Sequence, residues 1–144
     1  QVMAALNEGA SRAMVSVGVS AATDITGFGL LGHLTEMLEA ANLGAELTVS
    51  SIPLIDGVLD LADQGILPGG SKRNLESVRN SVDFGEIPAH LRNVLVDAQT
   101  SGGLLISVHP DRVDYLLETL AVERAQAAAV IGSVTPGRGI RLLS

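Results

Sequence analysis

One carboxylate stands just ahead of a glycine-rich segment that could open a helix. Asp24 is followed by Thr26, Gly27 and Gly29. The first turn of a helix leaves backbone N–H groups unpaired, and glycines let phosphate oxygens approach such groups closely. An Asp beside them supplies the hard oxygen ligand that Mg²⁺ prefers. The pattern therefore predicts either a metal-bound phosphate site or an ordinary helix cap at Thr26 with no ligand.

A second glycine-rich segment, residues 68–74, combines backbone amides with positive charge. It contains Gly70, and its basic residues Lys72 and Arg73 could neutralise phosphate charge, while Asn74 could hold a loop or a ligand oxygen. The alternative is a solvated basic turn. The segment lacks the spacing of a phosphate-binding P-loop and of the dinucleotide fingerprint, so on its own it does not identify a ligand.

A third such segment, residues 99–103, contains Ser101 and Gly102 and follows Asp97 much as the first follows Asp24. An Asp at this kind of boundary is also a common acceptor for local backbone amides. His33, in the helix expected after the first segment, could pair with a loop carboxylate, reach the mouth of the site, or be purely structural. We find no nucleophile with a neighbouring base, so the residues predict half of a site.

Composition narrows the classes of protein. The 144 residues are 47% hydrophobic and 17% charged, which suits one globular domain and excludes a disordered chain, and no apolar run approaches the length of a membrane span. The net charge of −7 argues against a nucleic-acid partner. The absence of Cys excludes disulfides and thiolate metal sites, and leaves the cytoplasm as the default expectation. Because the chain opens at Gln1 without Met or a signal segment, we expect an excised piece.

The apolar spacing predicts helices separated by short strands. Helices are expected over residues 2–17, from Thr26 to about 41, over 55–64, 75–79 and 91–98, and from Pro110 to about 120. Strands are expected over residues 19–23, 45–50, 82–84, 103–108, 128–134 and 140–143, with 68–74 as a loop. We interpret residues 103–134 as a βαβ-like unit and the end of the chain as a hairpin. The fold class is α+β, with helices covering a mixed sheet of split βαβ topology.

Three segments resemble one enzyme family, in the family's order. Residues 22–33 (ATDITGFGLLGH) are similar to the signature of selenide, water dikinase, also called selenophosphate synthetase. Residues 69–74 (GGSKRN) resemble its Gly-Gly loop, and residues 97–105 (DAQTSGGLL) its Asp-Pro-Gln-Thr-Ser-Gly-Gly-Leu-Leu stretch, with Ala98 in place of Pro. The resemblance runs from near Leu6 to Leu143.

The resemblance implies a single domain, residues 1–144, that is the C-terminal domain of a larger two-domain enzyme in the aminoimidazole ribonucleotide synthetase-like superfamily, with a partly ferredoxin-like topology. That family makes selenophosphate from selenide, ATP and water, releasing AMP and phosphate, and uses Mg²⁺. Asp24 would be the Mg²⁺ ligand from this domain. Candidate residues for binding the nucleotide are Thr26, Gly27, Gly29, Gly70, Arg73, Asn74, Ser101 and Gly102.

The family's nucleophile and its partner lysine belong to an N-terminal, ATP-binding domain that this sequence lacks. We therefore expect no catalytic residue here, and an isolated fragment that is inactive. The expected partners are that N-terminal domain, ATP, selenide and a second copy of the full-length enzyme. Two alternatives stay open, a domain of another ATP-dependent enzyme of the superfamily and a non-catalytic assembly module.

Overall fold

The computed structural model describes residues 7–125 and 127–144. The α-helices are α1 (Glu8–Val17), α2 (Gly29–Ala41), α3 (Val58–Asp63), α4 (Ser71–Val78), α5 (Ala89–Leu95) and α6 (Val113–Val122). The strands are β1 (Ala21–Asp24), β2 (Gly44–Thr48), β3 (Val82–Asp83), β4 (Leu104–Ser107), β5 (Gly132–Thr135) and β6 (Gly139–Leu143). The 3-10 turns η2 (Val49–Ser51) and η3 (Pro110–Arg112) follow β2 and β4. The first residues of the helix expected over 2–17 lie outside the described residues.

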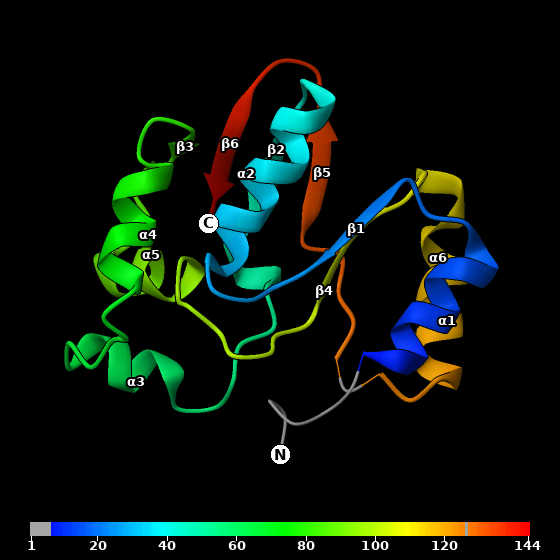
Figure 1. Ribbon diagram of the computed structural model, residues 1–144, viewed down its shortest axis with the longest axis horizontal. Coiled ribbons are helices and arrows are strands. Elements are labelled where there is room, and N and C mark those ends of the chain that lie inside the picture. Colours follow the sequence, from blue (N-terminus) through cyan, green and yellow to red (C-terminus); the bar gives the residue numbers. More distant parts are fainter. Residues whose placement is uncertain (1–6, 126) are drawn as a thin grey trace.

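The strands form two separate sheets (Figure 1). Strands β1 and β4 make a two-stranded antiparallel ribbon, and the other four are ordered β3-β6-β2-β5. Strand β6 is parallel to both β2 and β3, whereas β5 is antiparallel to β2. Because β6 lies between β2 and β3, the path from β2 through α3 and α4 to β3 is a split β-α-β connection. The predicted α+β class with a mixed sheet is confirmed.

Helix α2 covers one face of the four-stranded sheet (Figure 1). Its side chains Leu31, Leu34 and Leu38 recur at helical spacing and are buried, as the apolar stripe predicted. They pack in one core with alternate residues of β2 and β6, because side chains along a strand point to opposite faces in turn. The helix ends as expected at Asn42, which takes the left-handed conformation with φ 57°.

The opposite face of this sheet carries a polar row. Asp83, Arg141, Glu46 and Ser133 stand side by side in the register of the four strands. The guanidinium of Arg141 lies 3.2 Å from a carboxylate oxygen of Glu46. The alternation thus separates a buried apolar face from an accessible polar one.

A second, smaller core joins α1 to α6, side by side at the far end of the β1–β4 ribbon (Figure 1). It is built from Ala13 and Val17 of α1 and from Leu116 and Leu120 of α6. The ribbon therefore connects this helix pair to the α2 side of the molecule, where β1 ends and β4 begins. No helix of the described residues is long and apolar enough to cross a membrane.

Two predictions about connectivity and two about the bounds of elements were wrong. The expected strand over 128–134 is shorter and later, and β4 and β5 lie in different sheets, so residues 103–134 are not a βαβ unit. Strands β5 and β6 do not pair with each other as a hairpin, because β2 lies between them. Residues 71–74 belong to helix α4 and not to a loop, since Ser71 and Asn74 are buried on its inner face.

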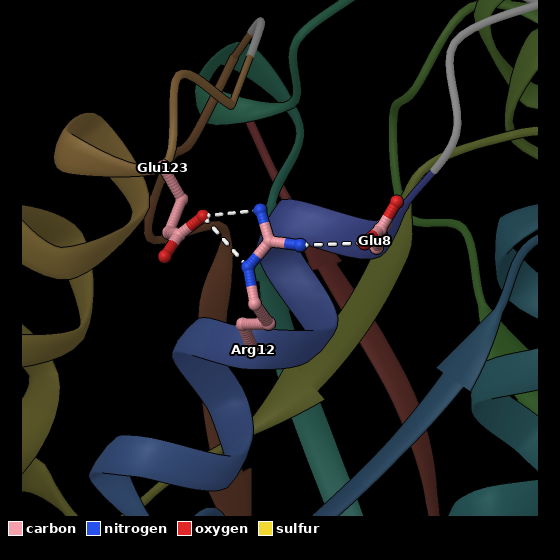
Figure 2. Close-up of polar contacts among 3 residues, drawn as sticks. All are labelled: Glu8, Arg12 and Glu123. Atoms are coloured by element: carbon pink, nitrogen blue, oxygen red, sulfur yellow. Dashed lines mark hydrogen bonds and ion pairs between the residues drawn. The ribbon is translucent and has the colours of Figure 1, made fainter.

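An arginine ties α1 to the end of α6 (Figure 2). Arg12 Nε and Nη2 donate to the same oxygen of Glu123, at 3.1 and 2.7 Å, while Nη1 lies 2.7 Å from a Glu8 oxygen. The hydrogen bond and the charge of Glu123 raise the pKa of Arg12, and Glu8 adds to this effect. Because the pKa of Arg12 is raised in the folded state, the charged side chain stabilises the fold at every pH below the ordinary Arg pKa. This stabilisation is lost only as the pH rises through the raised pKa, so it is constant around neutrality.

We expect Arg12→Met to lower the free energy of unfolding modestly, because the Arg12 side chain is exposed to solvent. Salt screens exposed charges, so the difference from wild type should shrink at high ionic strength. Denaturant unfolding at low and high salt measures it. Arg79→Met, which removes a mostly exposed contact to Glu76 within one helix, is the control and should change less. A salt-independent loss for Arg12→Met would contradict the electrostatic explanation.

Candidate functional site

The three glycine-rich segments meet, and a buried amide of the second one bonds to the first and to the backbone just before the third. Asn74 is 8% exposed, and its Nδ2 donates to the carbonyl oxygens of Gly27 at 2.8 Å and Val96 at 3.0 Å. One side chain of α4 therefore fixes the backbone before α2 and the backbone before residues 97–103. Of the two roles expected for Asn74, the structure contains the one in which it holds a loop.

Backbone hydrogen bonds join the first segment to the third. The N–H of Gln99 donates to the carbonyl oxygen of Thr26 at 3.0 Å, and that of Gly102 to Ile25 at 2.9 Å. The Ile25 N–H donates in turn to Gly103 at 2.9 Å. These bonds extend the β1–β4 ladder past its last pair, so the two loops form one unit at the end of the ribbon.

Asp97 is held by a side chain of α4. The hydroxyl of Ser71, which is 1% exposed, donates to Asp97 Oδ1 at 2.7 Å. This bond attaches the first residue of α4 to the start of the third segment. The expectation that Asp97 accepts from local backbone amides was wrong, because its partner in the structure is a side-chain hydroxyl 26 positions earlier in the chain.

The glycines of the site have different roles. Gly29 has φ +69°, and a Cβ there would lie 2.5 Å from the carbonyl carbon of Val96, so this position packs loop against loop. Its N–H donates to the Thr26 carbonyl at 3.1 Å and is not free for a ligand. Gly27 is exposed, and a Cβ there would meet nothing within 4 Å. Within residues 7–125 and 127–144, the N–H groups of Gly27 and Phe28 have no hydrogen-bond acceptor, which leaves them able to bind an anion.

The predicted cap at Thr26 was wrong. Phe28 occupies the N-cap position of α2, and no side chain caps the helix there. The Thr26 hydroxyl instead lies 3.1 Å from Nε2 of His33, whose Nδ1 is 3.3 Å from Glu36 Oε2. Because His33 is nearly buried and faces its own helix start, it pairs with a hydroxyl rather than with a loop carboxylate.

Asp24 is the last residue of β1, and its side chain is exposed. It pairs in register with Leu104 of β4, one residue before the loop unit formed by the first and third segments. Its carboxylate fits Mg²⁺ as a single hard ligand open to solvent. Among the described residues no group of three or more His, Cys, Asp or Glu side chains could hold a metal ion.

The remaining candidates lie around this unit. Arg73 is exposed on α4, whereas Gly70 and Ser101 are half-buried. A Cβ at Gly102 would lie 2.6 Å from the Ile25 carbonyl oxygen and closer still to Gln99 Oε1, so this glycine serves close packing. The contributions of Gln99 and of the Ser71 hydroxyl were missed from the sequence. The sequence signal for these two contributions was weak, because polar residues in a glycine-rich stretch are typical of any turn.

A sequence model of one protein family matches residues 2–143 of this chain. That family is described as "AIR synthase related protein, C-terminal domain". The chain belongs to this family. This AIR synthase-related domain is 46% identical over 140 residues to a selenide, water dikinase of Carboxydothermus hydrogenoformans, a match that covers 96% of this chain and 40% of that protein. Relatives with the same name from Clostridioides difficile and Escherichia coli are 39% and 42% identical over 94% and 99% of this chain. The AIR synthase-related domain thus spans about 40% of the length of these curated relatives.

Solved structures agree on the fold. The domain superimposes on the crystal structure of Escherichia coli HypE, a hydrogenase maturation protein, with a TM-score of 0.70 over 99% of this chain and 37% of that one. The sequences are only 20% identical, so this likeness concerns the fold alone.

Proposed function

We propose that this AIR synthase-related domain is the C-terminal domain of a selenide, water dikinase, an enzyme that makes selenophosphate from selenide, ATP and water and releases AMP and phosphate. The observation that carries the proposal is the convergence of all three sequence motifs on one loop unit, joined by Asn74 and placed beside the exposed Asp24. The identity of 39–46% to relatives with that name, over nearly the whole chain, supports it.

In this proposal the domain contributes to a site for ATP with Mg²⁺ and does not complete it. Asp24 supplies one carboxylate ligand, and the unpaired N–H groups of Gly27 and Phe28 bind phosphate oxygens. When bound, Mg²⁺ supplies positive charge that neutralises the phosphate oxygens. The guanidinium of Arg73 is exposed and can approach the outer phosphates, whereas Gly29 and Gly102 hold the loops together.

The nucleophile, its lysine and the remaining carboxylates then lie in an N-terminal domain of the same enzyme, and the full-length protein is a cytoplasmic homodimer. The isolated domain folds around its own two cores but does not hydrolyse ATP. Selenide dependence separates this proposal from another ATP-dependent enzyme of the superfamily, and AMP formation separates it from a non-catalytic assembly module.

Asp24→Asn in the full-length enzyme should lower selenide-dependent AMP formation by about 10- to 100-fold at limiting Mg²⁺, because the amide replaces a charged ligand by a weaker neutral one. The Mg²⁺ concentration for half-maximal rate should rise by a similar factor. Both follow from AMP production measured across a Mg²⁺ titration.

The matched control is Asp56→Asn, which removes an exposed carboxylate from the loop before α3 and should leave the Mg²⁺ titration unchanged. An Asp24→Asn enzyme with the wild-type rate and Mg²⁺ dependence would refute the assignment of Asp24. A wild-type enzyme that forms no AMP in the presence of selenide would refute the proposed function itself.

A further inference from the structure

Thr26 is held at both of its polar groups. Its carbonyl oxygen accepts from the N–H groups of Gly29 and Gln99, at 3.1 and 3.0 Å. Its hydroxyl oxygen lies 3.1 Å from His33 Nε2. Thr26 precedes Gly27, whose N–H is unpaired within the described part of the chain. Thr26 therefore has a fixed backbone and a hydroxyl group whose direction is set by the His33 imidazole.

The surroundings of His33 determine which atom carries the hydrogen of that bond. The ring is 9% exposed and lies against Phe28, with centroids 5.4 Å apart. Its Nδ1 faces the Glu36 carboxylate at 3.3 Å, and a carboxylate has no hydrogen to donate. In the neutral imidazole the proton therefore belongs on Nδ1, Nε2 is the acceptor, and the Thr26 O–H donates to it.

A hydroxyl that donates inward presents its lone pairs outward. We propose that His33 is a positioning residue, which makes the hydroxyl of Thr26, two residues beyond Asp24, a hydrogen-bond acceptor. Such an acceptor suits a water molecule in the hydration shell of Mg²⁺, since that cation keeps several waters when it binds through one or two carboxylates. A phosphate oxygen, which needs a donor, is left to the N–H groups of Gly27 and Phe28. This inference rests on the proposed function.

The tautomer is tested without any reaction. The protein is labelled with ¹⁵N-histidine, and the His33 signals are assigned by their loss in His33→Gln. At a pH where the ring carries one proton, we expect the shifts of a ring protonated on Nδ1. A ring protonated on Nε2 would overturn the inference, because Thr26 would then be the acceptor of that bond and could donate outward.

The functional test is a double-mutant cycle in the full-length enzyme. His33→Leu and Thr26→Val should each raise the Mg²⁺ concentration for half-maximal AMP formation by about threefold to tenfold, the range of one hydrogen bond, with a smaller effect on the rate at saturating Mg²⁺. The double variant should be no worse than either single variant, because both remove the same interaction. His33→Gln, whose amide oxygen can accept from Thr26, should recover most of the loss.

Glu39→Gln, an exposed carboxylate farther along α2, is the control and should keep the wild-type Mg²⁺ dependence. If His33→Leu does not fold, the Thr26→Val titration and the tautomer decide the question. In an active enzyme, two results would overturn the positioning role of His33. One is that the effects of His33→Leu and Thr26→Val on the Mg²⁺ dependence add in the double variant, and the other is that Thr26→Val keeps the wild-type Mg²⁺ dependence. A wild-type enzyme without selenide-dependent AMP formation would refute the proposed function instead.

Discussion

Gly29→Ala should destabilise the fold by about 3–5 kcal/mol, which is a large part of the stability of an ordinary domain. Two costs add. Gly29 has φ +69°, where an L-residue pays about 1–2 kcal/mol. The new methyl group would also lie 2.5 Å from the carbonyl carbon of Val96 and 2.7 Å from its oxygen. These are backbone atoms that cannot rotate away, so the loop before α2 and the backbone at Val96 must move apart.

Urea unfolding of the chain measures the loss, and Gly27→Ala is the matched control two residues earlier. A Cβ at Gly27 meets nothing within 4 Å, so the control should stay within about 1 kcal/mol of wild type. Equal stabilities for the two variants would show that the loops are not packed through Gly29.

Asn74→Asp should be the second severe change and should cost more than Asn74→Ala. The alanine variant leaves two carbonyl oxygens, those of Gly27 and Val96, without their donor, at about 2–3 kcal/mol. The aspartate variant places a carboxylate against the same two oxygens at a site that is 8% exposed, so about 3–5 kcal/mol is expected at neutral pH.

The pH dependence identifies the cause of the loss. Burial against carbonyl oxygens raises the pKa of the introduced carboxyl group above its unfolded value, so the folded state binds more protons and stability falls as the pH rises through that range. The Asn74→Asp loss should therefore shrink in acid, while the Asn74→Ala loss should not. Asn93→Asp on α5, where the side chain makes no hydrogen bond with the described residues, should be mild and is the control. An Asn74→Asp loss that does not depend on pH would contradict this picture.

Local pattern predicted the helices well where a long apolar stripe decided the structure. The stripe of α2 and its end at Asn42 followed from the sequence, as did the end of α1 at Gly18, which has φ +76°. The predicted helix at α4 began too late, because residues 69–74 (Gly-Gly-Ser-Lys-Arg-Asn) have the composition of a loop. Only the tertiary contacts of Ser71 and Asn74 explain why these residues are helical and buried.

Strand pairing could not be predicted from pattern. A turn signal over residues 136–139 made a hairpin the expected outcome, yet β5 and β6 pair with opposite edges of β2. Which strand a segment pairs with depends on partners far along the chain, and the turn itself carries no information on them. The three site segments were found through composition and resemblance, whereas the side chains that join them were not. The part that Asp24 plays stays a prediction until Mg²⁺ dependence is measured.

The position of β6 also governs when the molecule can fold during synthesis. This strand lies between β2 and β3, and its contact from Arg141 to Glu46 joins residues 95 positions apart. Before Gly139–Leu143 has left the ribosome, β3 lacks its partner and the core lacks Ile140 and Leu142. The edge of β2 that pairs with β6 then stays unpaired on the nascent chain, and unpaired strand edges of this kind are prone to aggregate before folding is complete. The sheet closes late in the translation of this domain, and slowly, because a contact of such long range must form first.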